Sequence, residues 1–139
     1  MAKPLALYVP IKPEKQKDAQ DICDNFVDVA GPGLSKIGLV HYALVFLIPT
    51  ADKKLIDAIV LVTSFDGDME TYLDKFWKDD GTKFAFQVLA GLSREEVPNV
   101  KTFDGFQRFI VKNNRANDLK LYNAYRYTVA DIKRDMPKE

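Results

Sequence analysis

The stretch LVTSFDGDMETYLDKF occupies residues 61–76 and changes character at its centre. Its first part is mostly apolar and β-branched, which is typical of a strand. Gly67 allows the chain to turn sharply, and Asp66 and Asp68 can accept hydrogen bonds from the free amides of a helix start. The stretch therefore predicts a strand that ends at Phe65, a corner at Asp66-Gly67-Asp68, and a helix beyond it.

The residues after the corner have the spacing of a core-facing helix. Apolar side chains recur at i, i+3, i+4, i+7 and i+8: Met69, Tyr72, Leu73, Phe76 and Trp77. This period predicts a helix over residues 69–77 with one buried face. Asp79-Asp80-Gly81 interrupts the pattern, and residues 84–92 form a second helical segment.

The residues before the corner predict an antiparallel hairpin. A long apolar run at residues 39–48 is closed by Pro49, and a polar connection leads to the strand at residues 58–65. If the hairpin ends at Pro49 and Asp57, His41 lies opposite Phe65. An imidazole would then stand beside Asp66.

The rest of the chain completes an α+β pattern. We expect a strand at residues 4–11, a helix from Pro13 to Ala30 that Gly31-Pro32-Gly33 ends, a short helix after Thr102, a strand at residues 119–127, and a terminal helix after Thr128. The order βαββαβ with extra helices indicates a single ferredoxin-like domain with an antiparallel sheet over residues 1–139.

Both hairpin strands are apolar at nearly every position. An antiparallel sheet with one face in water should alternate between apolar and polar residues. We therefore expect both faces to be covered, one by helices and the other by a second copy of the chain or a small apolar ligand. A homodimer of the dimeric α/β-barrel type fits this expectation.

The composition narrows the function classes. Lys and Arg total 20, as do Asp and Glu, and this balance argues against a general nucleic-acid binder. Cys23 is the only cysteine, so no intramolecular disulfide forms, and we expect a reducing, cytoplasmic setting with Cys23 as a small buried hydrophobe. No segment has the length and apolarity of a membrane span, and no signal peptide is evident.

Several stretches together resemble a poorly characterised bacterial family with a His-aromatic-Ala strand and an FDG corner. They are PLALYVPIKP (4–13), VHYALVFLIP (40–49), LVTSFDGDMETYLDKF (61–76), FQRFIV (106–111) and LYNAYRYTVADI (121–132). The resemblance implies a ferredoxin-like fold, and related domains occur near haem- or lipid-peroxide-using enzymes. Leu44 stands where that family has a basic residue, so the resemblance supports no anion pairing there.

His41 and Asp66 are the candidate catalytic residues, because Asp66 can orient the only histidine as a general base or a ligand. Equally, His41 can simply fix the corner by a hydrogen bond. The candidate ligand-binding residues are Phe65, Tyr122, Tyr125 and Arg126. No protein metal site is predicted because too few ligands lie together, whereas haem needs one axial histidine and stays open as a cofactor.

Two hypotheses follow from these residues. The first is a homodimeric domain that binds a small apolar ligand or a protein partner without chemistry of its own. The second is a haem-associated or other oxidoreductase of the dimeric α/β-barrel type that uses His41. No nucleophile elbow, P-loop or dinucleotide fingerprint is present to favour another class.

Overall fold

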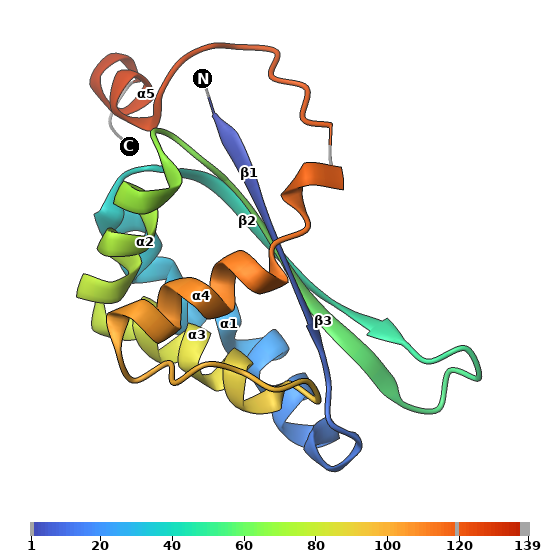
Figure 1. Ribbon diagram of the computed structural model, residues 1–139. Helices are drawn as coiled ribbons and strands as arrows, with labels where there is room; N and C mark the ends of the chain where they lie inside the picture. The colour runs from blue at the N-terminus through green and yellow to red at the C-terminus, as the bar shows by residue number, and fades with distance from the viewer. Residues whose placement is uncertain (1, 119, 137–139) are drawn as a thin grey trace.

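A computed structural model describes residues 2–118 and 120–136 of the chain (Figure 1). Within these residues it is an α+β structure with a three-stranded antiparallel sheet and five α-helices. The strands are β1 (Lys3–Pro10), β2 (Val40–Pro49) and β3 (Ile56–Phe65). The helices are α1 (Gln16–Ile37), α2 (Met69–Lys78), α3 (Asp80–Leu92), α4 (Phe103–Asn113) and α5 (Val129–Asp135), with short 3-10 turns η1 (Pro13–Lys15) and η2 (Ala116–Asp118).

The sheet has the order β1-β3-β2, so the strand before the corner is central. The predicted hairpin register is confirmed from the Tyr42–Ser64 pair to the Ile48–Ala58 pair. The prediction that His41 pairs with Phe65 is wrong, because Val40 takes that place. His41 is the extra residue of a β-bulge, which bends the strand and redirects a side chain.

Helices α1 to α4 gather on one side of the sheet (Figure 1). Alternate strand residues point toward these helices and form the core with them; among them are Leu5, Leu7, Val9, Ile59, Leu61 and Phe65. The helices contribute their apolar stripes, including Phe26, Tyr72, Phe76, Phe86, Phe106 and Phe109. Within residues 2–118 and 120–136, the opposite side of the sheet has no helical layer of this kind.

The first helix runs past its predicted end. Gly31-Pro32-Gly33 lies inside α1, which ends at Gly38, a left-handed residue with φ of 74°. Gly33 is a contact point, because a Cβ there would overlap the carboxylate of Asp79. The glycine thus allows α1 to approach the start of α3 closely, and packing overrides its poor helix propensity.

The predicted fourth strand is also a correction. Leu119 lies outside the described residues, and residues 120–127 form no strand. The outer edge of β1 has few backbone groups free to pair with a further strand. Pro4 and Pro10 lack an N–H, and Ala6 is already bonded to the Asn114 side chain and the Arg115 N–H. Isolated bridges between Leu7 and Asn114 and between Ile11 and Ser93, with a hydrogen bond from the Arg94 N–H to the Pro10 carbonyl, occupy other parts of that edge.

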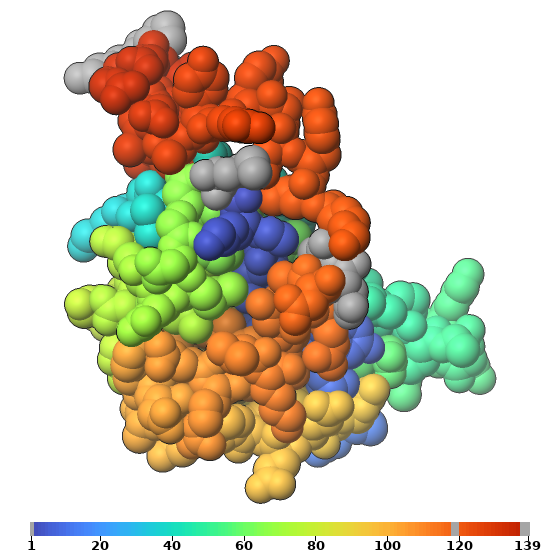
Figure 2. Space-filling view, turned by 45° about the horizontal axis from the view of Figure 1, so that its top comes forward, coloured from blue at the N-terminus to red at the C-terminus, as the bar shows by residue number. Residues whose placement is uncertain are grey.

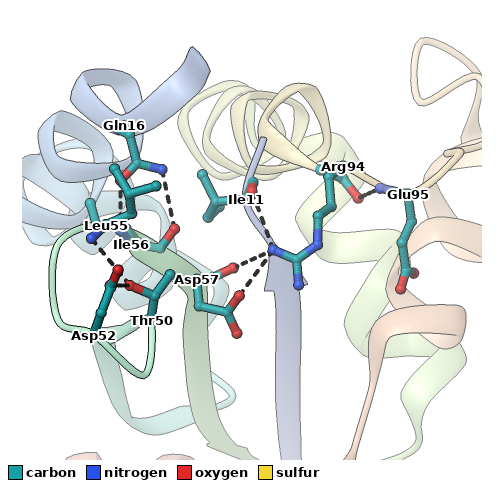
Figure 3. Close-up of polar contacts among 10 residues, drawn as sticks. Ile11, Gln16, Thr50, Asp52, Leu55, Ile56, Asp57, Arg94 and Glu95 are labelled. Carbon is teal, nitrogen blue, oxygen red and sulfur yellow. Dashed lines mark hydrogen bonds and ion pairs between the residues drawn. The ribbon is translucent and has the colours of Figure 1, made fainter. Parts of the chain in front are cut away.

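Side chains tie the turn end of the β2–β3 hairpin, at the start of β3, to the helical layer (Figure 3). Gln16 of α1 donates to the carbonyl of Ile56 (3.1 Å) and accepts from its N–H (2.6 Å). Arg94 donates to the carbonyl and the carboxylate of Asp57 at 3.0 and 3.1 Å. Beyond these ties the hairpin tip projects away from the body (Figures 1 and 2).

The acidic corner forms and Asp68 caps the helix after it as predicted, whereas the prediction that Asp66 also caps this helix is wrong, because its carboxylate bonds to His41 and Val129. Gly67 has φ of 89°, a conformation that favours glycine, and Asp68 caps α2 by accepting from the Thr71 N–H (2.8 Å). This hydrogen bond holds the pKa of the Asp68 carboxyl below its ordinary value. The corner therefore sets the direction in which α2 returns over the sheet.

Tyr72 fastens α2 to the central strand. Its ring stacks on Phe65 with centroids 4.0 Å apart, and its hydroxyl donates to the Thr63 hydroxyl at 2.7 Å. Burial raises the pKa of the Tyr72 phenol, so the hydroxyl keeps its proton and remains a donor. The contact joins a stacked aromatic pair to a hydrogen bond inside the core.

We predict that Tyr72→Phe lowers the free energy of unfolding by about 1–3 kcal/mol, because it leaves the Thr63 hydroxyl buried without its donor. The double variant Tyr72→Phe/Thr63→Val removes both partners and should recover part of that loss. Urea unfolding of the two variants measures the difference. A double variant whose losses simply add would show that the two hydroxyls do not interact.

Candidate functional site

Asp66 joins three separate segments at the end of the sheet. The residue is 7% exposed, and its Oδ1 lies 2.8 Å from His41 Nε2. Its Oδ2 accepts the N–H of Val129 at 2.7 Å, and its own N–H donates to the Leu39 carbonyl at 2.9 Å. One carboxylate thus connects the start of β2, the corner after β3 and the first turn of α5.

The bulge in β2 explains how His41 reaches Asp66. Regular pairing would place His41 opposite Phe65, but the extra residue turns its ring toward the corner. An ionised carboxylate only accepts hydrogen bonds, so the imidazole donates through Nε2. Among the described residues no hydrogen bond engages Nδ1, and the pair therefore presents one free ring nitrogen.

Residues 120–136, which we call the C-terminal arm, lie over this end of the molecule (Figures 1 and 2). Beyond the Asp66 contact, Asn123 donates to the Ala2 carbonyl at 3.2 Å and Lys133 to the Ser35 carbonyl at 3.3 Å. A capping box between Thr128 and Asp131 begins α5, as the sequence predicts. A few hydrogen bonds, rather than a strand ladder, attach the arm.

A hollow of about 360 Å³ lies between the C-terminal arm and the ends of β2 and β3; we call it the tyrosine hollow. Four of its lining residues are tyrosines, and His41 and Ser64 lie on the sheet side. The lining residues are Ala2, His41, Tyr42, Ser64, Tyr122, Asn123, Ala124, Tyr125, Tyr127, Ile132 and Met136. The hollow is where the arm, β2 and β3 meet.

The predicted site residues fall into two groups. His41 contacts Asp66, and His41 lines the hollow together with Tyr122 and Tyr125. Phe65 instead lies in the core on the helix side, stacked on Tyr72, and Arg126 is exposed and does not line the hollow.

Sequence reasoning missed Tyr42, Ser64 and Tyr127 as lining residues. A signal for two of them was present: Tyr42 and Ser64 form a pair in the predicted register, so their side chains share one face of the sheet. Nothing in the sequence placed the arm over that face.

Within the described residues, no group of three or more His, Cys, Asp and Glu side chains is placed to share a metal ion. No helix in that part of the chain has the length and apolarity to cross a membrane. The His41–Asp66 pair can position an imidazole, donate a hydrogen bond and present Nδ1 as a single ligand or base.

A scan against protein-family models found no match, and searches of the curated proteins and of the solved structures found none either. The resemblance to the bacterial family with the FDG corner therefore stays a prediction.

We predict that Asp66→Ala releases the C-terminal arm, because it leaves the Val129 N–H and the His41 Nε2 without their acceptor. The free energy of unfolding should fall by about 1–3 kcal/mol. Hydrogen exchange of residues 120–136 measures the release.

Asp68→Ala is the matched control at the same corner, since Asp68 bonds only within the first turn of α2. It should speed exchange in α2 and leave the arm protected. Equal exchange of the arm in both variants would contradict the role given to Asp66.

Proposed function

We propose that the chain is a self-associating binding module in which two copies pack sheet against sheet, in the manner of the dimeric α/β barrels. The order β1-β3-β2 supports the ferredoxin-like reading, since it matches three of that fold's four strands. The bridge from Leu7 to Asn114 lies on the side of β1 where the fourth strand of that fold would stand. The observation that carries the proposal is the exposed apolar row Tyr42, Leu44 and Phe46, on the side of the sheet that helices α1 to α4 do not cover.

This side, which we call the open face, consists of the strand residues that alternate with those of the core. It comprises Ala6, Tyr8, Tyr42, Leu44, Phe46, Ile48, Val60, Val62 and Ser64. None of them is charged, although the chain is 29% charged. Tyr42, Leu44 and Phe46 are 43%, 55% and 46% exposed, and such a continuous apolar patch is typical of an interaction surface.

The shape of the open face is complementary to the same face of a second copy of the chain. Large side chains stand along the edge strand β2, whereas the paired positions on β3 hold smaller residues such as Val60 and Ser64, both nearly buried. A ridge thus lies beside a trough. A two-fold axis would place each ridge in the partner's trough, which is the self-complementarity that an isologous dimer requires.

The open face alone is smaller than a stable dimer interface. It spans seven residue positions on each of three strands, and standard strand spacings give it an area of roughly 350 Å². A stable interface buries about 800 Å² on each partner. The projecting tip of the β2–β3 hairpin borders the open face and supplies additional surface.

We predict that the protein sediments as a dimer with a dissociation constant of about 1 μM or tighter. Phe46→Asp should shift it to monomer, because a charge would be buried without a partner at the centre of the interface. Sedimentation velocity over a concentration series measures the change.

Phe84→Asp provides the control, since Phe84 is a comparably exposed phenylalanine on α3, outside the open face. That variant should stay dimeric. A wild-type protein that remains monomeric at every concentration would refute the association, and a dimer broken equally by both variants would place the contact elsewhere.

The second candidate is the haem-associated oxidoreductase, and one observation favours it. A histidine that ligates a metal usually donates its other ring N–H to a carboxylate, as His41 does to Asp66. His41, through Nδ1, would then be the residue that holds the haem iron. A bound haem would supply redox chemistry, while the residues of the chain orient the ligand.

A haem titration separates this candidate from a simple binding module. If the enzyme hypothesis is correct, haem added to the wild-type protein gives a shifted Soret band, and His41→Ala abolishes the shift. Asp66→Asn should keep the band but weaken haem binding by about 10- to 100-fold, as loss of a ligand-orienting carboxylate typically does. An identical spectrum in wild type and His41→Ala would eliminate His41 as the axial ligand.

A further inference from the structure

We propose that the tyrosine hollow is a binding site for a small uncharged aromatic molecule that carries one hydrogen-bonding group. The site goes beyond the proposed association, because every residue of its lining belongs to a single copy of the chain. Three properties of the hollow support the assignment: aromatic walls, a polar floor and the absence of charged lining residues.

The walls are built from aromatic rings. Tyr122, Tyr125 and Tyr127 come from the arm and Tyr42 from β2, with Ile132 and Met136 of the arm beside them. Aromatic rings attract a further ring by offset or edge-to-face contact and by burial of apolar area. The volume of 360 Å³ falls within the range of small-molecule sites, about 300–1,000 Å³.

The floor offers hydrogen bonds that the protein does not use. Ser64 is 2% exposed and lines the hollow, and no hydrogen bond among the described residues engages its hydroxyl. His41 Nδ1 is likewise without a hydrogen bond in the described part of the chain. Neither group is sealed inside the protein: the His41 side chain is 19% exposed, and a hydroxyl or amine of a ligand in the hollow can bond to either group.

The charge of the lining selects against ions. The hollow contains no Lys, Arg, Asp or Glu side chain, and Arg126 does not line it. An anion would find no cation, and it would approach the Asp66 carboxylate, which lies behind the His41 ring. Burial of an unpaired charge is costly, so the hollow favours uncharged ligands.

The small number of hydrogen bonds that attach the arm fits a site that closes on its ligand. Tyr122 and Tyr125 are 87% and 78% exposed, so both rings keep most of their apolar surface in water. A ring bound between the arm and the sheet would cover part of that surface. It would also add contacts to a segment that a few hydrogen bonds now attach.

Phenol, toluene and benzoate form a matched set of probes for this site. Amide chemical shifts of the full-length, ¹⁵N-labelled protein are followed during titration with each. Phenol should shift residues of the arm and the ends of β2 and β3, and bind about three- to tenfold more tightly than toluene, because one neutral hydrogen bond is gained. Benzoate should bind more weakly than phenol.

Ser64→Ala should lower phenol affinity to that of toluene, and Tyr122→Ala/Tyr125→Ala should weaken both probes. Phe84→Ala, which removes an exposed ring elsewhere, should leave binding unchanged. Phenol shifts that map to another surface, or that persist in the double tyrosine variant, would overturn the site. If benzoate bound as tightly as phenol, the proposal that the ligand is uncharged would be overturned.

The monomeric variant Phe46→Asp separates this site from the proposed dimer. Phenol should bind it with wild-type affinity, because Phe46 does not line the hollow. Loss of phenol binding together with dimerisation would refute a site contained in one copy. Phenol binding by a wild-type protein that proves monomeric would keep the site and reject only the association.

Discussion

The sheet is apolar on both sides, and the helices of the described chain cover only one of them. This constraint follows from composition, since β2 and β3 carry hydrophobic residues at successive positions instead of alternating with polar ones. Helices α1 to α4 bury the odd-numbered residues of β1 and β3, and the alternate set stays accessible along β2. Burial of apolar surface is the main favourable contribution to folding and association, so the uncovered side is the part of the molecule with most left to gain from a partner.

Asp66 determines how the end of this sheet is organised. Its neighbour Asp68 performs the local task of capping α2, which leaves the Asp66 carboxylate free for contacts distant in sequence. One oxygen holds the redirected His41 and the other holds the first turn of α5. A single buried carboxylate therefore sets both the orientation of the imidazole and the position of the arm above it.

The features that sequence reasoning predicted are local or follow from strand pairing. The hairpin register follows from the lengths of two apolar runs and their connection, and the caps at Asp68, Thr102 and Thr128 are short-range signals. The contact of His41 with Asp66 was predicted because the register brings them together. The bulge that turns His41 toward Asp66 was not predicted, because no residue type in that part of β2 requires a bulge.

The features that sequence reasoning missed depend on tertiary contacts. Gly31-Pro32-Gly33 has the composition of a helix end, yet Gly33 is needed where α1 packs against Asp79 of α3. Residues 120–127 have the aromatic content of a strand, but the edge of β1 that would receive them has no donor at Pro4 and Pro10, and the Ala6 donor is already bonded to Asn114. The bond from Val129 to Asp66 spans 63 residues and has no local signal.

The absent fourth strand and the tyrosine hollow have the same origin. A strand paired with β1 would place Tyr122 on one face of the sheet and Tyr125 and Tyr127 on the other, and would leave no space between sheet and arm. Because Pro4, Pro10 and the Asn114–Ala6 contact block that edge, the segment crosses above the sheet end and keeps its rings together. The prolines that protect the edge of β1 from pairing thus also keep residues 120–127 out of the sheet, and three tyrosines of that segment line the hollow instead.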